Sequence, residues 1–133
     1  MIYHIVPEKE YLKSVEEEHY IPDNFNDFGF IHCAFEVSVL SVADDYYLNI
    51  KDRLILLKIN PERLIANVRN EEAVPEQGSG TSHLGTSKIF PHIYGPLNNS
   101  AIEGIGELKK ENGKYSWPVN FISLSKYLEH KKC

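Results

Sequence analysis

The stretch Leu54 to Ile59, LILLKI, carries the clearest strand signal in the chain. Five of its six residues are apolar, with no alternation between apolar and polar positions. Such a run is typical of a strand buried on both faces of a sheet. Asn60-Pro61 follows directly and ends the run, because proline has no backbone N–H to continue a ladder. We therefore expect a buried strand over residues 54–59.

The residues before this strand predict a short strand and two helices. IYHIV, residues 2–6, is rich in strand-forming residues and is followed by Pro7. Residues 8–20, EKEYLKSVEEEHY, place apolar side chains on one helical face and acidic ones in the first turn, which predicts one amphipathic helix. Helical spacing of apolar residues recurs over 36–50 and predicts a second helix.

The residues after it predict mostly strands. Residues 65–74 read as a strand that carries Arg69, and 75–88, PEQGSGTSHLGTSK, as a long polar loop. Residues 100–118 predict a hairpin that turns at Glu111–Lys114, and the tail ends in a short helix. Strands outnumber helices, so the expected fold class is α+β: a single domain with a split, curved β-sheet, two N-terminal helices, and helices on one side.

Composition excludes several classes of protein. The chain has 133 residues, enough for one domain with one core, and a net charge of −5. An acidic chain lacks the basic face that general nucleic-acid binding or an anionic membrane requires. No apolar stretch approaches the ~20 residues that span a bilayer, and no secretory signal is visible. The two cysteines, Cys33 and Cys133, form no framework, so we expect a cytoplasmic protein.

Two histidines stand inside apolar segments. His32 lies in GFIHCAF, residues 29–35, and His92 in FPHIYGPL, residues 90–97. If the second segment is extended, Phe90, His92 and Tyr94 share one face, a combination suited to a ligand pocket. A buried imidazole must find a hydrogen-bond partner, so satisfied core histidines are the alternative interpretation. Arg69 could bind a ligand phosphate or pair with the nearby Glu71 and Glu72.

IYHIV, GFIHCAF and FPHIYGPL together resemble the family of domain of unknown function 952, over roughly residues 1–106. The resemblance implies a core domain over 1–108, with 109–133 as an added hairpin and tail packed on the same domain. It also implies an ADP-ribosyltransferase-like fold that binds NAD in a cleft. In that comparison His4 and His32 would contact the nucleotide, with His92 and Tyr94 in the same cleft. A late-strand carboxylate, Glu103 or Glu107, would complete the site.

Three functions remain open at this point. The first is an ADP-ribosyltransferase-type enzyme with NAD as cofactor, His32 and His92 as catalytic residues, and a cofactor site made of His4, His32, Tyr94 and Arg69. The second is a metal-dependent enzyme using His32, His83 and His92, although no strong metal-binding spacing is present. The third is a non-catalytic module that binds a ligand or a partner without turnover. Convergence of His4, His32 and His92 on one open cavity would favour the first and third.

Overall fold

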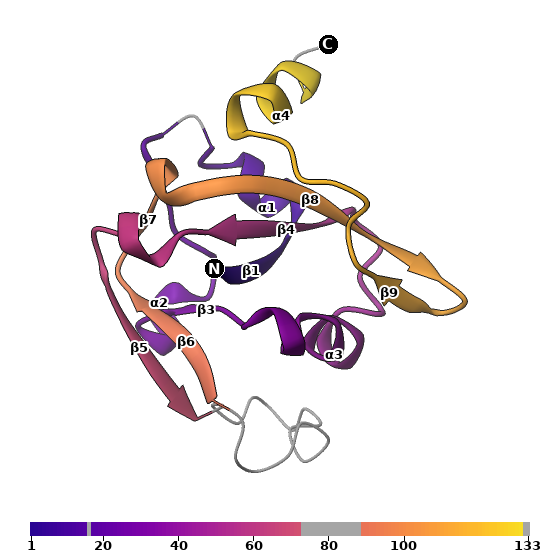
Figure 1. Cartoon of the computed structure of the whole chain (residues 1–133), viewed down its shortest axis with the longest axis horizontal. Helices are drawn as coiled ribbons and strands as arrows, with labels where there is room; N and C mark the ends of the chain where they lie inside the picture. Colours follow the sequence, from indigo (N-terminus) through magenta and orange to yellow (C-terminus); the bar gives the residue numbers. More distant parts are fainter. Residues whose placement is uncertain (16, 73–88, 132–133) are drawn as a thin grey trace.

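A computed structural model describes residues 1–15, 17–72 and 89–131 as a mixed α/β domain with a curled antiparallel sheet and few helices (Figure 1). The elements follow in chain order: β1 (Ile2–Pro7), α1 (Glu8–Leu12), β2 (His19–Tyr20), α2 (Phe25–Phe28), β3 (Ile31–His32), α3 (Glu36–Tyr46), β4 (Leu54–Ile59), η1 (Pro61–Arg63), β5 (Asn67–Glu72), β6 (Ile89–Tyr94), β7 (Leu97–Asn98), η3 (Asn99–Ala101), β8 (Ile102–Glu111), β9 (Lys114–Ser116) and α4 (Leu124–Lys131).

The strands form two main groups. One has the order β1-β4-β8-β9 and the other β3-β6-β5, while β2 and β7 form a short pair. In Figure 1, β5 and β6 run at a steep angle to β4 and β8. A bridge between Tyr3 and Ala34 joins the edge strand β1 to the chain just after β3. The two strand groups are therefore joined at this bridge and separate on either side of it.

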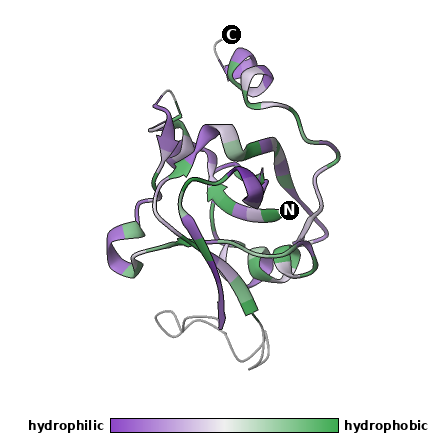
Figure 2. Ribbon diagram, turned by 60° about the vertical axis from the view of Figure 1, so that its left-hand side comes forward, coloured by the Kyte–Doolittle hydropathy of each residue, from purple (hydrophilic) through white to green (hydrophobic). Residues whose placement is uncertain are grey.

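Strand β4 is buried on both faces, as its sequence predicts. Ile55, Leu57 and Ile59 face one hydrophobic core, and Leu54 and Leu56 face a second. Figure 2 shows hydrophobic residues along the strands at the centre of the molecule. Burying a side chain of this size contributes about 1.5–3 kcal/mol to folding. This strand is the structural centre of the domain.

The expectation that helices lie on one side of the sheet is wrong. Val39 and Ala43 of α3 pack in the core on one face of β4, whereas Tyr11 of α1 and Tyr127 of α4 pack in the core on the other. An apolar run without alternation exposes apolar side chains on both faces, so both must be covered. The tail helix supplies part of that cover.

Several predicted elements are confirmed. The second helix occupies Glu36–Tyr46, the strand with Arg69 spans Asn67–Glu72, and the tail ends in α4. The hairpin turns at Asn112-Gly113, whose φ angles of 54° and 82° match the turn type that two-residue hairpins favour. The polar loop predicted at 75–88 lies outside the described residues.

The single helix predicted over residues 8–20 is wrong beyond Leu12. Helix α1 ends there, and His19–Tyr20 instead pairs with Leu97–Asn98. The intervening turn is held from far away in the sequence. The Asn99 side-chain amide donates to the carbonyl oxygens of Val15 (3.3 Å) and Glu17 (2.8 Å). Long-range contacts of this kind override a local helical pattern.

Replacing Asn99 with alanine should destabilise this turn. Both carbonyl groups would lose a donor at a cost of about 1–2 kcal/mol. We expect faster amide hydrogen exchange in residues 13–20 than in the wild type, while β4 amides exchange at the unfolding-limited rate in both. Asn67→Ala, in an exposed part of β5, is the matched control. Equal exchange at 13–20 in wild type and Asn99→Ala would contradict the role of this side chain.

The last quarter of the chain contributes side chains to both hydrophobic cores. Tyr115 packs in the same core as α3, and Tyr127 packs in the same core as α1. Strand β8 runs from Ile102 to Glu111 and therefore crosses the predicted boundary between residues 1–108 and 109–133. That division of the chain stays a prediction.

Within the described residues, no helix combines the length and apolarity needed to cross a membrane. Cys33 is buried and unpaired, and burial raises the pKa of its thiol.

Candidate functional site

The three predicted histidines line one cleft of about 360 Å³. Its walls come from the edge strand β1, the chain entering α2, the C-terminal half of α3, and strands β3 and β6. The lining is mainly apolar and aromatic, with Val42, Ile50 and Phe90 among its residues. Concave apolar sites with a few converging polar groups are typical ligand pockets. We call this feature the histidine cleft.

His4 is fully engaged within the protein. Its Nδ1 lies 2.6 Å from the carbonyl oxygen of His32, and its Nε2 lies 2.9 Å from the hydroxyl of Tyr20. A carbonyl only accepts, so Nδ1 carries the proton and the Tyr20 hydroxyl donates to Nε2. Burial lowers the pKa of His4 to about 4. His4 is thus a neutral structural residue that joins β1 to β3 at the base of the cleft.

His32 has an unsatisfied ring nitrogen. Its Nε2 is buried and has no hydrogen-bond partner among the described residues. Burial, and then the neighbouring His92 and His4, lower the pKa of His32 to about 4, so the ring is neutral at pH 7. The ring contacts Phe28 edge-on at 4.6 Å between ring centres. Leaving a buried polar atom without a partner is costly, so a hydrogen bond from a ligand to this nitrogen would be favourable.

His92 has a carboxylate partner. It faces His32 across β3 and β6, with ring centres 5.7 Å apart, and is 2% exposed. Its Nδ1 lies 2.8 Å from Oε1 of Glu71 on the next strand, β5. From the sequence, Glu71 is predicted only as a possible salt-bridge partner of Arg69. Its contact with His92 depends on the β5–β6 register, which pairs Arg69 with His92.

Tyr94 and Arg69 stand next to the cleft but do not line it. The Tyr94 hydroxyl donates to the same Glu71 oxygen at 2.6 Å, and this bond raises the pKa of Tyr94. The Arg69 guanidinium lies over the Tyr94 ring, 4.9 Å from its centre, and makes no ion pair with Glu71. Phe90, His92 and Tyr94 do share one face, as predicted. The apolar residues Ile31 and Ile93 point to the opposite face, into the core.

The backbone of Ile5 forms part of the cleft wall. Along an antiparallel strand, alternate residues direct their N–H and C=O groups to opposite sides. Tyr3 uses both groups to pair with Ala34, on the side away from β4. Ile5 lies two residues further on, so its N–H and C=O point the same way. No described residue pairs with them there, which leaves one donor and one acceptor side by side at the cleft.

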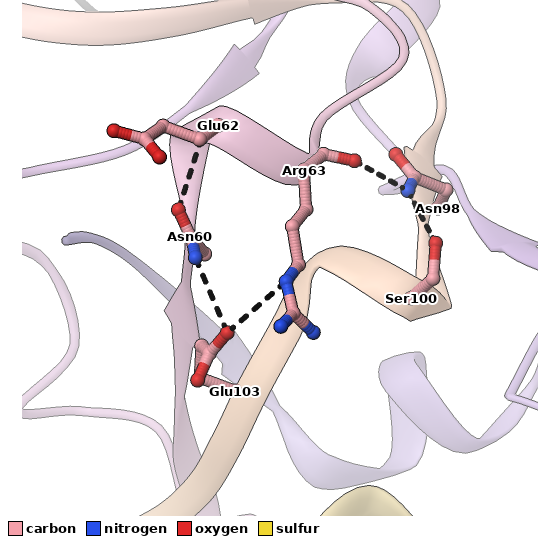
Figure 3. Close-up of polar contacts among 6 residues, drawn as sticks. All are labelled: Asn60, Glu62, Arg63, Asn98, Ser100 and Glu103. Atoms are coloured by element: carbon pink, nitrogen blue, oxygen red, sulfur yellow. Dashed lines mark hydrogen bonds and ion pairs between the residues drawn. The ribbon is translucent and has the colours of Figure 1, made fainter.

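Neither late-strand carboxylate lines the histidine cleft. Glu103 accepts a hydrogen bond from Asn60 at 3.3 Å and lies 3.7 Å from Nε of Arg63, in the polar cluster of Figure 3. Glu107 lies 3.5 Å from Nε of Arg53. Both carboxylates are held by cations at the surface of β8. Among the residues that line the cleft, the acidic ones are Glu10 of α1 and Asp23, just before α2.

The described residues contain no cluster of three or more histidine, cysteine, aspartate or glutamate side chains arranged to hold a metal ion. His83, the third ligand of the metal hypothesis, lies outside the described part of the chain. Two of the three histidines in the metal hypothesis, His32 and His92, lie on neighbouring strands. The metal hypothesis itself stays a prediction.

A comparison of the sequence with known protein families finds a match, which covers most of the segments that form the histidine cleft. The family described as protein of unknown function (DUF952) has a model that matches residues 5–105. The chain belongs to the DUF952 family. The match includes His32, His92 and Glu71, and therefore most of the cleft. No curated protein matches the chain.

Two solved structures resemble this DUF952 protein over nearly its whole length. Protein CC0527 from Caulobacter crescentus superposes with a TM-score of 0.70 at 21% identity, covering 96% of this chain and 97% of that one. A double mutant of CC0527 gives a TM-score of 0.69 at 20% identity with the same coverage. At this level of identity the likeness shows a shared fold, and it covers nearly the whole of both chains.

Proposed function

We propose that this DUF952 protein binds NAD or a related nucleotide in the histidine cleft and is an ADP-ribosyltransferase-like enzyme. In this proposal the nicotinamide ring and its ribose occupy the cleft, where His32 hydrogen-bonds the ribose hydroxyls and His92 lies beside the reacting carbon. The observation that carries the proposal is the convergence of three histidines on one open cleft, with Nε2 of His32 lacking a partner.

The free edge at Ile5 supports a ligand with a primary carboxamide. Such a group offers one acceptor oxygen and two N–H donors in a plane, which complements an adjacent backbone N–H and C=O. Nicotinamide carries this group on an aromatic ring, and Phe90 provides an apolar surface in the same cleft. The aromatic ring and the amide would thus each meet a matching part of the wall.

The charge of the cleft also supports this orientation. No lysine or arginine is among its lining residues, and burial keeps His4 and His32 neutral at pH 7. The cationic nicotinamide ring of NAD would enter without repulsion, whereas a diphosphate would find no partner inside. Arg69, paired with His92 in the strand register, is the cation we propose for the phosphates outside the cleft.

The first test is binding and cleavage of NAD. We expect NAD to raise the melting temperature by several degrees, since free ligand at 100 times Kd stabilises a protein by about 2.7 kcal/mol. We also expect release of nicotinamide, measured by chromatography. His32→Phe should abolish both effects, and His19→Phe, at an exposed histidine, should abolish neither. No thermal shift with NAD, ADP-ribose or AMP would rule the proposal out.

A second candidate is a module that binds the same ligand without turnover. It is favoured by the position of Glu103 and Glu107, since both are engaged by arginine away from the cleft. The two candidates differ in one measurement. A thermal shift that depends on His32, without nicotinamide release over a day at high protein concentration, would select the binding module.

A further inference from the structure

One oxygen of Glu71 receives two hydrogen bonds. Oε1 lies 2.8 Å from Nδ1 of His92 and 2.6 Å from the hydroxyl of Tyr94. These two bonds, with smaller effects from the charges of His92 and Arg69, hold the pKa of Glu71 below its usual range. The carboxylate is therefore ionised at neutral pH and can only accept hydrogen bonds.

This arrangement decides which nitrogen of a neutral His92 carries the proton. Since the Glu71 oxygen accepts, Nδ1 must donate, and Nε2 is left with a lone pair. Glu71 does not line the histidine cleft, whereas His92 does. The end of the ring that faces away from Glu71, which carries Nε2, is therefore the end available to a ligand.

The ring of His92 is also held in orientation. Phe30 stacks on it with ring centres 4.0 Å apart and planes inclined by 20°. The side chain is 2% exposed, so little space remains for a ring flip. The carboxylate contact fixes the tautomer, and the stacked phenyl ring fixes the plane. Both are features of an imidazole prepared for proton transfer.

We infer that Glu71 is a positioning residue that holds His92 as the Nδ1–H tautomer, so that Nε2 meets the ligand as a hydrogen-bond acceptor and base. This inference deepens the proposed function and rests on it for the identity of the ligand. The acceptor we propose is a hydroxyl compound or water, which loses a proton to a base when its oxygen attacks.

The step balances as follows. The acceptor oxygen forms a bond to C1′ of the nicotinamide ribose while the bond from C1′ to the ring nitrogen breaks. Nicotinamide leaves with the bonding electron pair and becomes neutral. The acceptor proton passes to Nε2 of His92, and the carboxylate of Glu71 stabilises the resulting imidazolium. Tyr94, bonded to the same oxygen, keeps the carboxylate in place.

The test reads the tautomer directly in the protein without ligand. Long-range ¹H–¹⁵N spectra distinguish protonated from unprotonated ring nitrogens, and the His92→Gln variant assigns the signal among the six histidines. We expect the wild type to show Nδ1–H and bare Nε2 at pH 8. Glu71→Ala should give a mixture of tautomers, and Glu72→Ala, at the exposed neighbouring residue, should match the wild type.

Glu71→Gln provides a second, milder variant if Glu71→Ala fails to fold. Its amide oxygen still accepts from Nδ1, so the tautomer is retained, but the neutral group does not stabilise an imidazolium. NAD cleavage should then fall about 100-fold with little change in NAD affinity. Cleavage by Glu71→Gln at the wild-type rate would overturn the inference.

The tautomer result separates this inference from the proposed function. Wild-type protein with Nε2–H, or an unchanged Nδ1–H signal in Glu71→Ala, would overturn the role of Glu71 whatever the ligand. The expected tautomers together with no response to NAD would uphold that role and refute NAD as the ligand.

Discussion

Replacing His4 with phenylalanine should lower the free energy of unfolding by about 2–5 kcal/mol and the melting temperature by roughly 10–20 °C. Phenylalanine fills a similar volume but makes no hydrogen bond. The carbonyl of His32 and the hydroxyl of Tyr20 would both lose the partner they have in the buried interior. The measurement is thermal and urea unfolding, with His19→Phe at an exposed histidine as control.

A double-mutant cycle can separate the two hydrogen bonds of His4. Tyr20→Phe removes only the bond to Nε2 and should cost about 1–2 kcal/mol. In the double variant that hydroxyl is already gone, so the total cost should be smaller than the sum of the single costs. Strict additivity would contradict the bond between His4 and Tyr20, and a His4→Phe protein as stable as the wild type would show that His4 does not join the two strand groups.

The sequence predicts the parts of this fold that depend on local pattern. Strand β4 follows from a run in which five of six residues are apolar, and the β8–β9 hairpin from Asn112-Gly113. The shared face of Phe90, His92 and Tyr94 follows from period-two geometry alone. Each of these features is decided by residues that are close together in the chain.

What the sequence could not predict depends on strand register between distant segments. The contact of Glu71 with His92 is fixed only once β5 and β6 are aligned, and a shift of one residue would turn Glu71 to the other face. The bond from His4 to the His32 carbonyl likewise needs the Tyr3–Ala34 bridge. The helix predicted over 8–20 is wrong for the same reason, because the Asn99 side chain binds the carbonyls of Val15 and Glu17 from more than 80 positions away.

Acidification should destabilise the protein through His4. An unfolded histidine has a pKa of about 6.5, whereas burial lowers the pKa of folded His4 to about 4. Between these values the unfolded chain binds a proton that the folded protein does not. The free energy of unfolding therefore falls as the pH drops from 6.5 to 4, by about 3 kcal/mol for this residue.

His4→Phe identifies the part of this loss that belongs to His4. We expect the difference in unfolding free energy between wild type and His4→Phe to shrink by about 3 kcal/mol from pH 6.5 to pH 4, measured by urea unfolding at a series of pH values. Glu71 contributes at lower pH, because its folded pKa lies below its usual value and its stabilisation is lost only as the carboxylate protonates. Glu71→Gln should accordingly remove the Glu71 contribution to the profile below about pH 4.5. A wild-type minus His4→Phe difference that is constant between pH 6.5 and pH 4 would mean that His4 is not held neutral, and the bonding pattern that closes the base of the cleft would have to be reassigned.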